Sequence, residues 1–251
     1  MSFALISDIH SNLTALQAVM EYIDRRGIKE IFCLGDIVGY GPQPAECLDL
    51  LIDKGVVSII GNHDHAVFFE PTNFNVGAEK ASYWTRQCLE EETDKDRRNR
   101  RWHFIGRLPV RLEMGNFLLV HGSPRRPVNE YIFPDDVYTN SGKISANFER
   151  VRQLCFVGHT HVPGVFLEDP DFYSTDELDM EYPITDAERA IINVGSVGQP
   201  RDQDIRASYA IVNEKKVEFI RVDYDYEATA KLIIDNPNLD DFEGERLRDG
   251  R

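Results

Sequence analysis

Residues 3–36 read FALISDIHSNLTALQAVMEYIDRRGIKEIFCLGD, and they contain two short apolar runs separated by one amphipathic segment. The apolar runs cover residues 3–7 and 31–34. Apolar runs of this length, bounded by turn residues, are typical of strands that are buried on both faces. Between them, residues 12–26 carry apolar side chains at helical spacing, and Gly27 follows as a stop signal. The pattern predicts a strand, a helix and a second strand parallel to the first, joined by a right-handed crossover.

The same alternation continues along the chain. Further strands are predicted at residues 56–60, 117–120, 154–157, 191–194, 209–212 and 217–222, and further helices at 42–54, 76–88 and 99–108. The first third therefore reads βαβαβ, whereas the strands after residue 191 follow one another without long helices between them. We expect an α/β protein with two sheets flanked by helices, formed by residues 1–251 as a single domain.

Composition restricts the function classes. The chain has 251 residues with 28 Lys and Arg against 43 Asp and Glu, a net charge of −15, which disfavours nucleic acid as a partner. No apolar run approaches the roughly 18 residues of a membrane span, and the N-terminus lacks the basic start of a signal peptide. The four cysteines form no CxxC pair, which indicates reduced thiols. We expect a cytoplasmic protein with no membrane partner, and the oligomeric state is left open.

Metal-ligating residue types follow the predicted strands. Six of the seven histidines lie at or just beyond the carboxyl end of a strand. The candidates at these ends are Asp8, His10, Asp36, Asn62, His121, His159 and His161. Open α/β sheets bind ligands at that edge. Carboxylates mixed with imidazoles, without thiolates, suit Mn, Fe, Ni or Zn and argue against a structural zinc finger.

The number of candidate ligands predicts two ions. Seven ligands exceed what one ion needs and match two ions that share a bridging carboxylate. Two divalent ions carry +4 and two carboxylates carry −2. The remaining +2 would attract a phosphate and stabilise the charge of an in-line displacement.

These residues form an ordered set of motifs. DIH, GDIVGYGP, GNHD, the histidine of VHGS, and GHTH resemble the motifs of the calcineurin-like metallophosphoesterases, and the chain is most similar to their compact bacterial and archaeal phosphodiesterase branch. NVGSVGQPR at 193–201 resembles the closing glycine-rich loop of that branch, with Val194 where proline is common. The resemblance implies a four-layer αββα sandwich.

The resemblance also implies a role for each site residue. One metal ion would be held by Asp8, His10 and His161, the other by Asn62, His121 and His159, with Asp36 bridging them. His63 would bind the phosphate and protonate the leaving oxygen while Asp64 orients its ring; the alternative for His63 is a brace of the site. Arg201 is a candidate substrate contact, with a surface salt bridge as its alternative.

The leading functional hypothesis is a dinuclear phosphoesterase, with manganese favoured, that hydrolyses small phosphomonoesters or phosphodiesters, nucleotides included, by attack of metal-bound hydroxide. GDIVGYGP lacks the aspartate and arginine of GDxVDRG, so the alternatives of a Ser/Thr protein phosphatase or a dinucleoside polyphosphate hydrolase are less favoured. A metal-binding scaffold of the same fold is the second alternative, although the intact ligands and His63 argue against it. A DNA exonuclease conflicts with the charge of −15, and a β-lactamase-like zinc hydrolase would need an HxHxDH run.

The segments between and after the motifs have expected roles of their own. Residues 66–115 and 125–150 are expected to form the pocket walls that choose the substrate. The basic run at 95–101 is expected on a solvated helix face paired with Glu90–Glu92, and the acidic segment 168–188 in an exposed loop or edge insertion. His65 is expected at the surface and His103 at the edge of the core.

Overall fold

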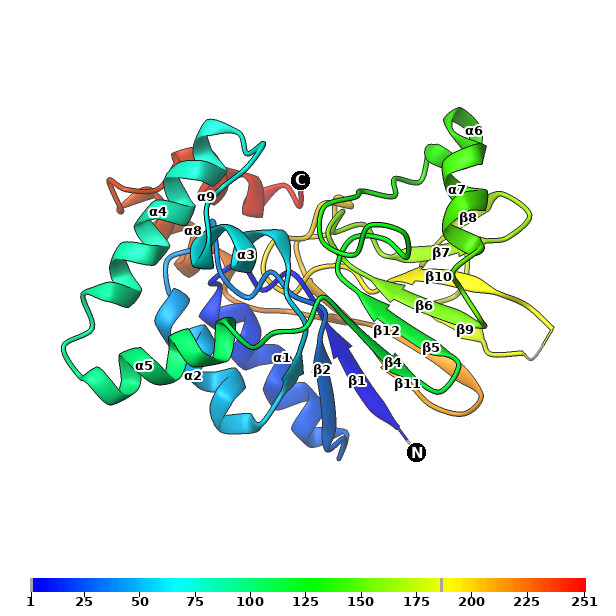
Figure 1. The fold of residues 1–251 in the computed structure, drawn as a ribbon, viewed down its shortest axis with the longest axis horizontal. Helices are drawn as coiled ribbons and strands as arrows, with labels where there is room; N and C mark the ends of the chain where they lie inside the picture. Colours follow the sequence, from blue (N-terminus) through cyan, green and yellow to red (C-terminus); the bar gives the residue numbers. More distant parts are fainter. Residues whose placement is uncertain (1, 186) are drawn as a thin grey trace.

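The computed structural model describes residues 2–185 and 187–251, and two six-stranded sheets packed face to face form its centre (Figure 1). The first sheet has the order β3-β2-β1-β11-β12-β9. Its strands are β1 (Phe3–Ile6), β2 (Glu30–Cys33), β3 (Val57–Ser58), β9 (Glu181–Pro183), β11 (Ala207–Val212) and β12 (Lys216–Val222). The second sheet has the order β4-β5-β6-β10-β7-β8. Its strands are β4 (Arg111–Met114), β5 (Phe117–Val120), β6 (Leu154–Val157), β7 (Gly164–Leu167), β8 (Asp171–Ser174) and β10 (Ala190–Asn193).

Both sheets are mixed. Strands β1, β2 and β3 run parallel in the first sheet, as β5, β6 and β10 do in the second, while the remaining neighbours are antiparallel. Each sheet therefore has three parallel strands whose carboxyl ends lie at one edge of that sheet.

Helices cover the two outer faces of the sheets (Figure 1). The helices of the described residues are α1 (Leu13–Arg25), α2 (Pro44–Lys54), α3 (Asn62–Phe68), α4 (Val76–Glu90), α5 (Lys95–Ile105), α6 (Asp136–Thr139), α7 (Ser141–Phe148), α8 (Tyr226–Ile234), α9 (Asp241–Glu245) and the 3-10 turn η1 (Arg246–Arg248). Helices α1 to α5, α8 and α9 lie on the side of the first sheet, and α6 and α7 lie on the side of the second.

Strand β1 shows why the sandwich has four layers. Alternate side chains of a strand point to opposite faces of its sheet. Phe3 and Leu5 pack in the core between the two sheets, whereas Ala4 and Ile6 pack in the core beneath α1 and α2. A third core lies between the second sheet and α7. A strand that is buried on both faces is apolar throughout, and the predicted αββα sandwich is confirmed.

The structure contains the predicted strands, together with four strands that the sequence pattern did not predict. The strand predicted at 56–60 shrinks to Val57–Ser58, because the amide of Ile60 leaves the sheet and donates to the carbonyl of Pro109 at 2.9 Å. Strands β4, β7, β8 and β9 were not predicted, since three of them mix polar with apolar residues and β7 is a short run between Pro163 and the acidic segment.

The predictions for the two charged segments, residues 95–101 and 168–188, agree with the structure to different degrees. Residues 95–101 begin α5, but Arg101 is buried, where it donates to Asp49 and Glu92, so the prediction of a solvated face is wrong at this residue. The acidic segment 168–188 supplies β8 and β9, each the edge strand of its sheet, in agreement with an edge insertion; its residue 186 lies outside the described residues. Among the residues the structure describes, no helix is long and apolar enough to cross a bilayer.

Candidate metal centre

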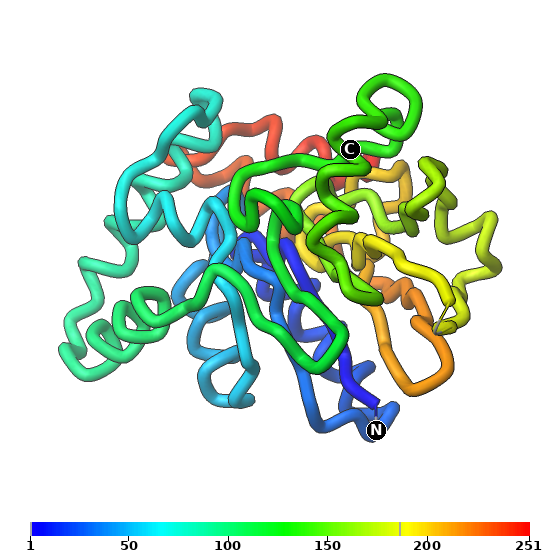
Figure 2. Tube along the Cα trace, turned by 45° about the vertical axis from the view of Figure 1, so that its right-hand side comes forward, coloured from blue at the N-terminus to red at the C-terminus, as the bar shows by residue number. Residues whose placement is uncertain are grey.

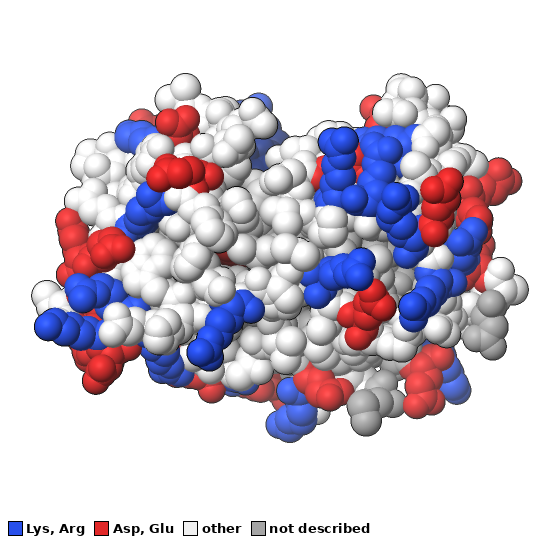
Figure 3. Space-filling model, in the orientation of Figure 1, with Lys and Arg blue, Asp and Glu red and all other residues white. Residues whose placement is uncertain are grey.

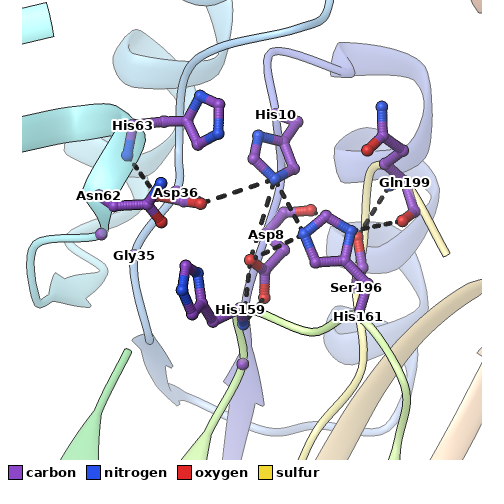
Figure 4. Close-up of polar contacts among 12 residues, drawn as sticks. Asp8, His10, Gly35, Asp36, Asn62, His63, His159, His161, Ser196 and Gln199 are labelled. Carbon is purple, nitrogen blue, oxygen red and sulfur yellow. Dashed lines mark hydrogen bonds and ion pairs between the residues drawn. The ribbon is translucent and has the colours of Figure 1, made fainter. Parts of the chain in front are cut away.

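The predicted ligands come together at the carboxyl ends of the parallel strands (Figure 4). Strand β1 leads to Asp8 and His10, and β2 leads to Asp36. Helix α3 begins at Asn62 shortly after β3, β5 leads directly to His121, and β6 leads to His159 and His161. All seven side chains are buried.

The backbone of the centre is strained. Five of the seven predicted ligands have a left-handed backbone: Asp8 (φ 52°), His10 (47°), Asp36 (52°), His159 (66°) and His161 (62°). A residue with a Cβ pays roughly 1–2 kcal/mol for this conformation, so it persists only where the surrounding structure enforces it. The loops are shaped to turn these side chains inward.

The first cluster contains Asp8, His10 and His161. The Nε2 atoms of His10 and His161 are 3.1 Å apart, and His161 Nε2 is 3.2 Å from Asp8 Oδ1. Although burial alone would raise the pKa of Asp8, the charge and hydrogen bond of His161 lower it to about 2. The Asp8 carboxylate also accepts the amide of His159, which connects the two clusters.

The second cluster contains Asn62, His121 and His159 beside Asp36. His121 Nε2 is 3.0 Å from Asn62 Oδ1, 3.0 Å from His159 Nδ1 and 3.3 Å from Asp36 Oδ2. Asp36 Oδ2 is also 3.7 Å from His10 Nε2, so one carboxylate oxygen faces both clusters. The other oxygen, Oδ1, accepts the amide of His63 at 2.8 Å.

The tautomers show that these clusters fit metal ions. His10, His121 and His161 each direct Nδ1 toward a backbone carbonyl, of Val38 (3.3 Å), Leu34 (2.9 Å) and Gln199 (2.6 Å). A carbonyl only accepts, so Nδ1 carries a proton in each ring, and Nε2 is the nitrogen that faces the cluster and offers a lone pair to an ion once it is deprotonated. The Nε2 atoms of His10 and His161 lie 3.1 Å apart, and when both are deprotonated their lone pairs repel unless a cation lies between them.

Asp64 does not contact the ring of His63, so the prediction that it orients this ring is wrong. Its carboxylate accepts the amides of Ile37 (2.9 Å), Val38 (3.2 Å) and Gly61 (3.0 Å). The carboxylate caps α3 and fastens the loop after Asp36 to that helix. Asp64 therefore shapes the centre through the backbone.

His63 lies at the edge of the two clusters. Its ring centroid is 4.9 Å from that of His10, 4.4 Å from Tyr40 and 4.7 Å from Phe74. The buried Nδ1 has no hydrogen-bond partner among the described residues, and burial lowers the pKa of the ring to about 4. Its nitrogen also lies within 4.8 Å of ligand atoms of His10 and Asp36. One imidazole nitrogen of His63 therefore lies near the carboxylate that faces both clusters.

Arg201 lies beside the first cluster. Its backbone amide donates to the carbonyl of His161 at 3.3 Å, and its guanidinium lies 5.8 Å from the ring centroid of Tyr40. Within residues 2–185 and 187–251 no carboxylate pairs with it, so the alternative of a salt bridge is not found. Of the remaining histidines, His65 is exposed as expected, whereas His103 is exposed on α5 instead of lying at the core edge.

Comparison with known proteins identifies the family. The model of the calcineurin-like phosphoesterase superfamily domain matches residues 1–216. The chain belongs to this superfamily. A metallophosphoesterase from Sphaerobacter thermophilus, whose crystal structure is solved, is 37% identical with a TM-score of 0.80, over 100% of this chain and 99% of that one.

Two archaeal proteins are also similar. "Uncharacterized protein MJ0912" of Methanocaldococcus jannaschii is 40% identical over 99% of this chain and 98% of its own. The crystal structure of hypothetical protein PH1004 from Pyrococcus horikoshii OT3, at 20% identity and a TM-score of 0.78 over 100% of this chain and 98% of that one, shares the fold. The superfamily makes the protein a metal-dependent phosphoesterase and implies divalent ions, for which the buried clusters are suited.

A cavity of about 550 Å³ adjoins the centre of this phosphoesterase. Asn62, His63 and His159 contribute to its lining, together with Phe74 and Tyr131, which belong to none of the sequence motifs. Tyr131 stacks on His159, with ring centroids 3.7 Å apart and an interplanar angle of 16°. Both aromatic residues fall in the two segments expected to form the pocket walls, but no local pattern distinguishes them there.

Gly158 is a position where an added methyl group should disturb the phosphoesterase centre directly. A Cβ at residue 158 would lie 2.1 Å from Ser7 Oγ and 2.3 Å from Asp8 Oδ2. We expect Gly158→Ala to displace Asp8, to lower the metal content, and to destabilise the fold by about 1–3 kcal/mol, as overpacking does. Elemental analysis and thermal unfolding measure both effects. Gly142→Ala on α7, where a Cβ meets nothing within 4 Å, is the matched control; equal metal content in the two variants would contradict the prediction.

Proposed function

We propose that the protein hydrolyses small phosphomonoesters or phosphodiesters, nucleotides included, with two divalent ions, manganese favoured. The observation that carries the proposal is the position of Asp36 Oδ2, which faces His121 at 3.3 Å and His10 at 3.7 Å, between two groups of imidazole lone pairs. One ion would be held by Asp8, His10 and His161, the other by Asn62, His121 and His159, with Asp36 shared. Bound there, the ions supply charge stabilisation and a water of lowered pKa.

His63 is the proposed proton donor to the leaving oxygen. Its ring lines the cavity and lies 4.9 Å from the ring centroid of His10, so a substrate seated in the cavity would meet it. Burial lowers the pKa of His63 to about 4 in the free site. The negative charge of a bound phosphate favours the protonated ring, which then holds a proton beside the leaving group. Arg201, which lacks a carboxylate partner among the described residues, would contact a phosphate oxygen.

The size and charge of the surroundings favour a small substrate. The cavity of about 550 Å³ suits a small ester. Lys and Arg side chains gather on one half of the face in Figure 3, over the second sheet. Four arginines line a groove: Arg111, Arg125, Arg150 and Arg152. Each has a glutamate within 4 Å, namely Glu113, Glu130 or Glu149. This pairing leaves little free positive charge for a nucleic-acid backbone.

Hydrolysis of two chromogenic esters tests the proposal. We expect the protein to hydrolyse p-nitrophenyl phosphate or bis-p-nitrophenyl phosphate when Mn²⁺ is added and to lose that activity in EDTA, because the ions neutralise the phosphate in the transition state. The preferred ester distinguishes a monoesterase from a diesterase. Metal binding without turnover of either ester would instead favour the scaffold alternative.

A further inference from the structure

The chain beyond the family domain reaches back to the centre. The family model ends at residue 216, and the segment after β12 forms α8, α9 and η1. In both ribbon and tube views this segment ends at the opposite side of the molecule from the N-terminus, where β1 begins (Figures 1 and 2). It therefore lies toward the carboxyl end of β1, where the centre is built.

Three connections join this C-terminal segment to the loop after β10, which covers residues 194–206. The first passes through Asn12, and the other two are direct hydrogen bonds. Thr229 on α8 donates to Asn12 Oδ1 at 3.0 Å, and Asn12 in turn donates to the carbonyl of Gly198 at 2.8 Å. The amide of Gln203 donates to the carbonyl of Gly250 at 2.8 Å. The third contact joins Gln199 to Glu243 on α9 at 2.8 Å.

Glu243 is the unusual member of these contacts, because it is a carboxylate that is only 4% exposed and that the proposed chemistry does not use. Its Oε2 accepts Nε2 of Gln199, which is 2% exposed. Arg246 Nη1 lies 3.5 Å from the same oxygen and balances its charge. A buried carboxylate is costly, so its retention calls for a reason beyond packing.

The orientation of the Gln199 amide follows from Glu243. A carboxylate accepts, so the NH₂ group of Gln199 must face Glu243 and the amide oxygen must face the other way. That oxygen accepts Nη2 of Arg201 at 2.6 Å and Nε at 3.2 Å. If the amide were reversed, its NH₂ group would meet the N–H groups of Arg201 and both hydrogen bonds would be lost.

The amide oxygen of Gln199 is neutral, so it orients Arg201 without forming an ion pair with it. A carboxylate placed directly on Arg201 would hold the guanidinium and cancel its charge. Through Gln199, Glu243 fixes the guanidinium while leaving its positive charge available beside His161, whose Nδ1 donates to the backbone carbonyl of the same Gln199 at 2.6 Å (Figure 4). A free, oriented guanidinium is the group that a phosphate oxygen requires.

We propose that Glu243, in the C-terminal segment outside the family domain, is a positioning residue that acts through Gln199 to hold Arg201 for the phosphate group of the substrate. The inference rests on the proposed function. It assigns the last helices of the chain a part in substrate recognition that the motifs of residues 8–161 do not include.

A double-mutant cycle on the metal-loaded full-length protein tests this assignment. Glu243→Gln keeps the shape of the side chain but replaces the charged acceptor of the Gln199 amide by a neutral group that can also donate, so Gln199 is held less firmly. We expect inorganic phosphate, measured by calorimetry, to bind about tenfold more weakly and KM for the preferred ester to rise, with kcat changed less. In an Arg201→Ala background, the same change should alter phosphate affinity by less than about twofold, since Glu243 acts only through Arg201. Glu245→Gln, an exposed glutamate on the same helix, is the matched control and should leave both values unchanged.

A purely structural role would give a different result. Equal losses from Glu243→Gln in both backgrounds, or no loss in the wild-type background, would overturn the assignment. If Glu243→Gln does not fold, Gln199→Met removes the amide relay alone and should reproduce the tenfold loss. If the wild-type protein neither hydrolyses an ester nor binds phosphate, the proposed function itself has failed. If the wild type is active but the Glu243 and Arg201 substitutions cause independent, additive losses of phosphate affinity, only the role of Glu243 is refuted.

Discussion

Asp36→Asn should lose most of its bound metal and more than about 100-fold of its turnover, because even partners that only support metal ligands cost 10–100-fold when they are mutated. The carboxylate of Asp36 has one free oxygen, Oδ2, and that oxygen faces both clusters. An asparagine that keeps the hydrogen bond from the amide of His63 through its oxygen would present an NH₂ group to His10 and His121. A donor group in that place excludes a cation from both clusters at once.

Metal content by elemental analysis, measured with the Mn²⁺-dependent turnover, checks this result. The control is Asp24→Asn, an equal change at an exposed carboxylate that pairs with Lys54 at 2.6 Å. We expect the control to keep two ions per chain and full activity. Turnover near that of wild type in Asp36→Asn would refute a centre with a shared ligand.

The position of the centre followed from the sequence because strand order sets it. Asp8 and His161 are far apart in the chain, yet each follows an apolar run that had to be a buried parallel strand. Within one sheet, parallel strands deliver their loops to the same edge, so the ligands after β1 and β2 and those after β5 and β6 were each predictable as a group. That the two groups meet depends on how the two sheets pack against each other, which the strand pattern does not give. The same apolar runs also predicted a hydrophobic core on each side of the sheets, because a strand that is apolar throughout is buried on both faces.

Contacts within the loops were not predictable in the same way. Asp64 was expected at the ring of His63, but the amides of Ile37, Val38 and Gly61 take both of its oxygens. That outcome depends on the path of a loop, and a loop path is set by tertiary packing, which no local pattern encodes. Motif spacing identifies which residues converge, whereas it does not say which donor each acceptor meets.

No sequence pattern predicted the residues that line the cavity or the contacts of the C-terminal segment. Phe74 and Tyr131 carry no periodicity that separates them from other aromatic residues in the variable segments. Gln199 and Glu243 are 44 positions apart, and only the packing of α9 against the loop after β10 brings them together. Buried polar side chains of this kind become informative only when their partners are seen.

His63→Ala should retain both metal ions and yet slow turnover by about 10²–10⁴, the usual contribution of general acid catalysis. The loss should depend on the leaving group, because an alkoxide needs a proton as it departs and p-nitrophenolate does not. We therefore expect a large loss with an alkyl phosphoester and a much smaller one with the p-nitrophenyl ester. His103→Ala, which removes an exposed histidine of α5, is the matched control and should not affect either substrate. Equal losses of turnover on both esters would mean that His63 only braces the site. Loss of one metal ion from the variant would mean that His63 is a metal ligand, which agrees with its position near His10 and Asp36.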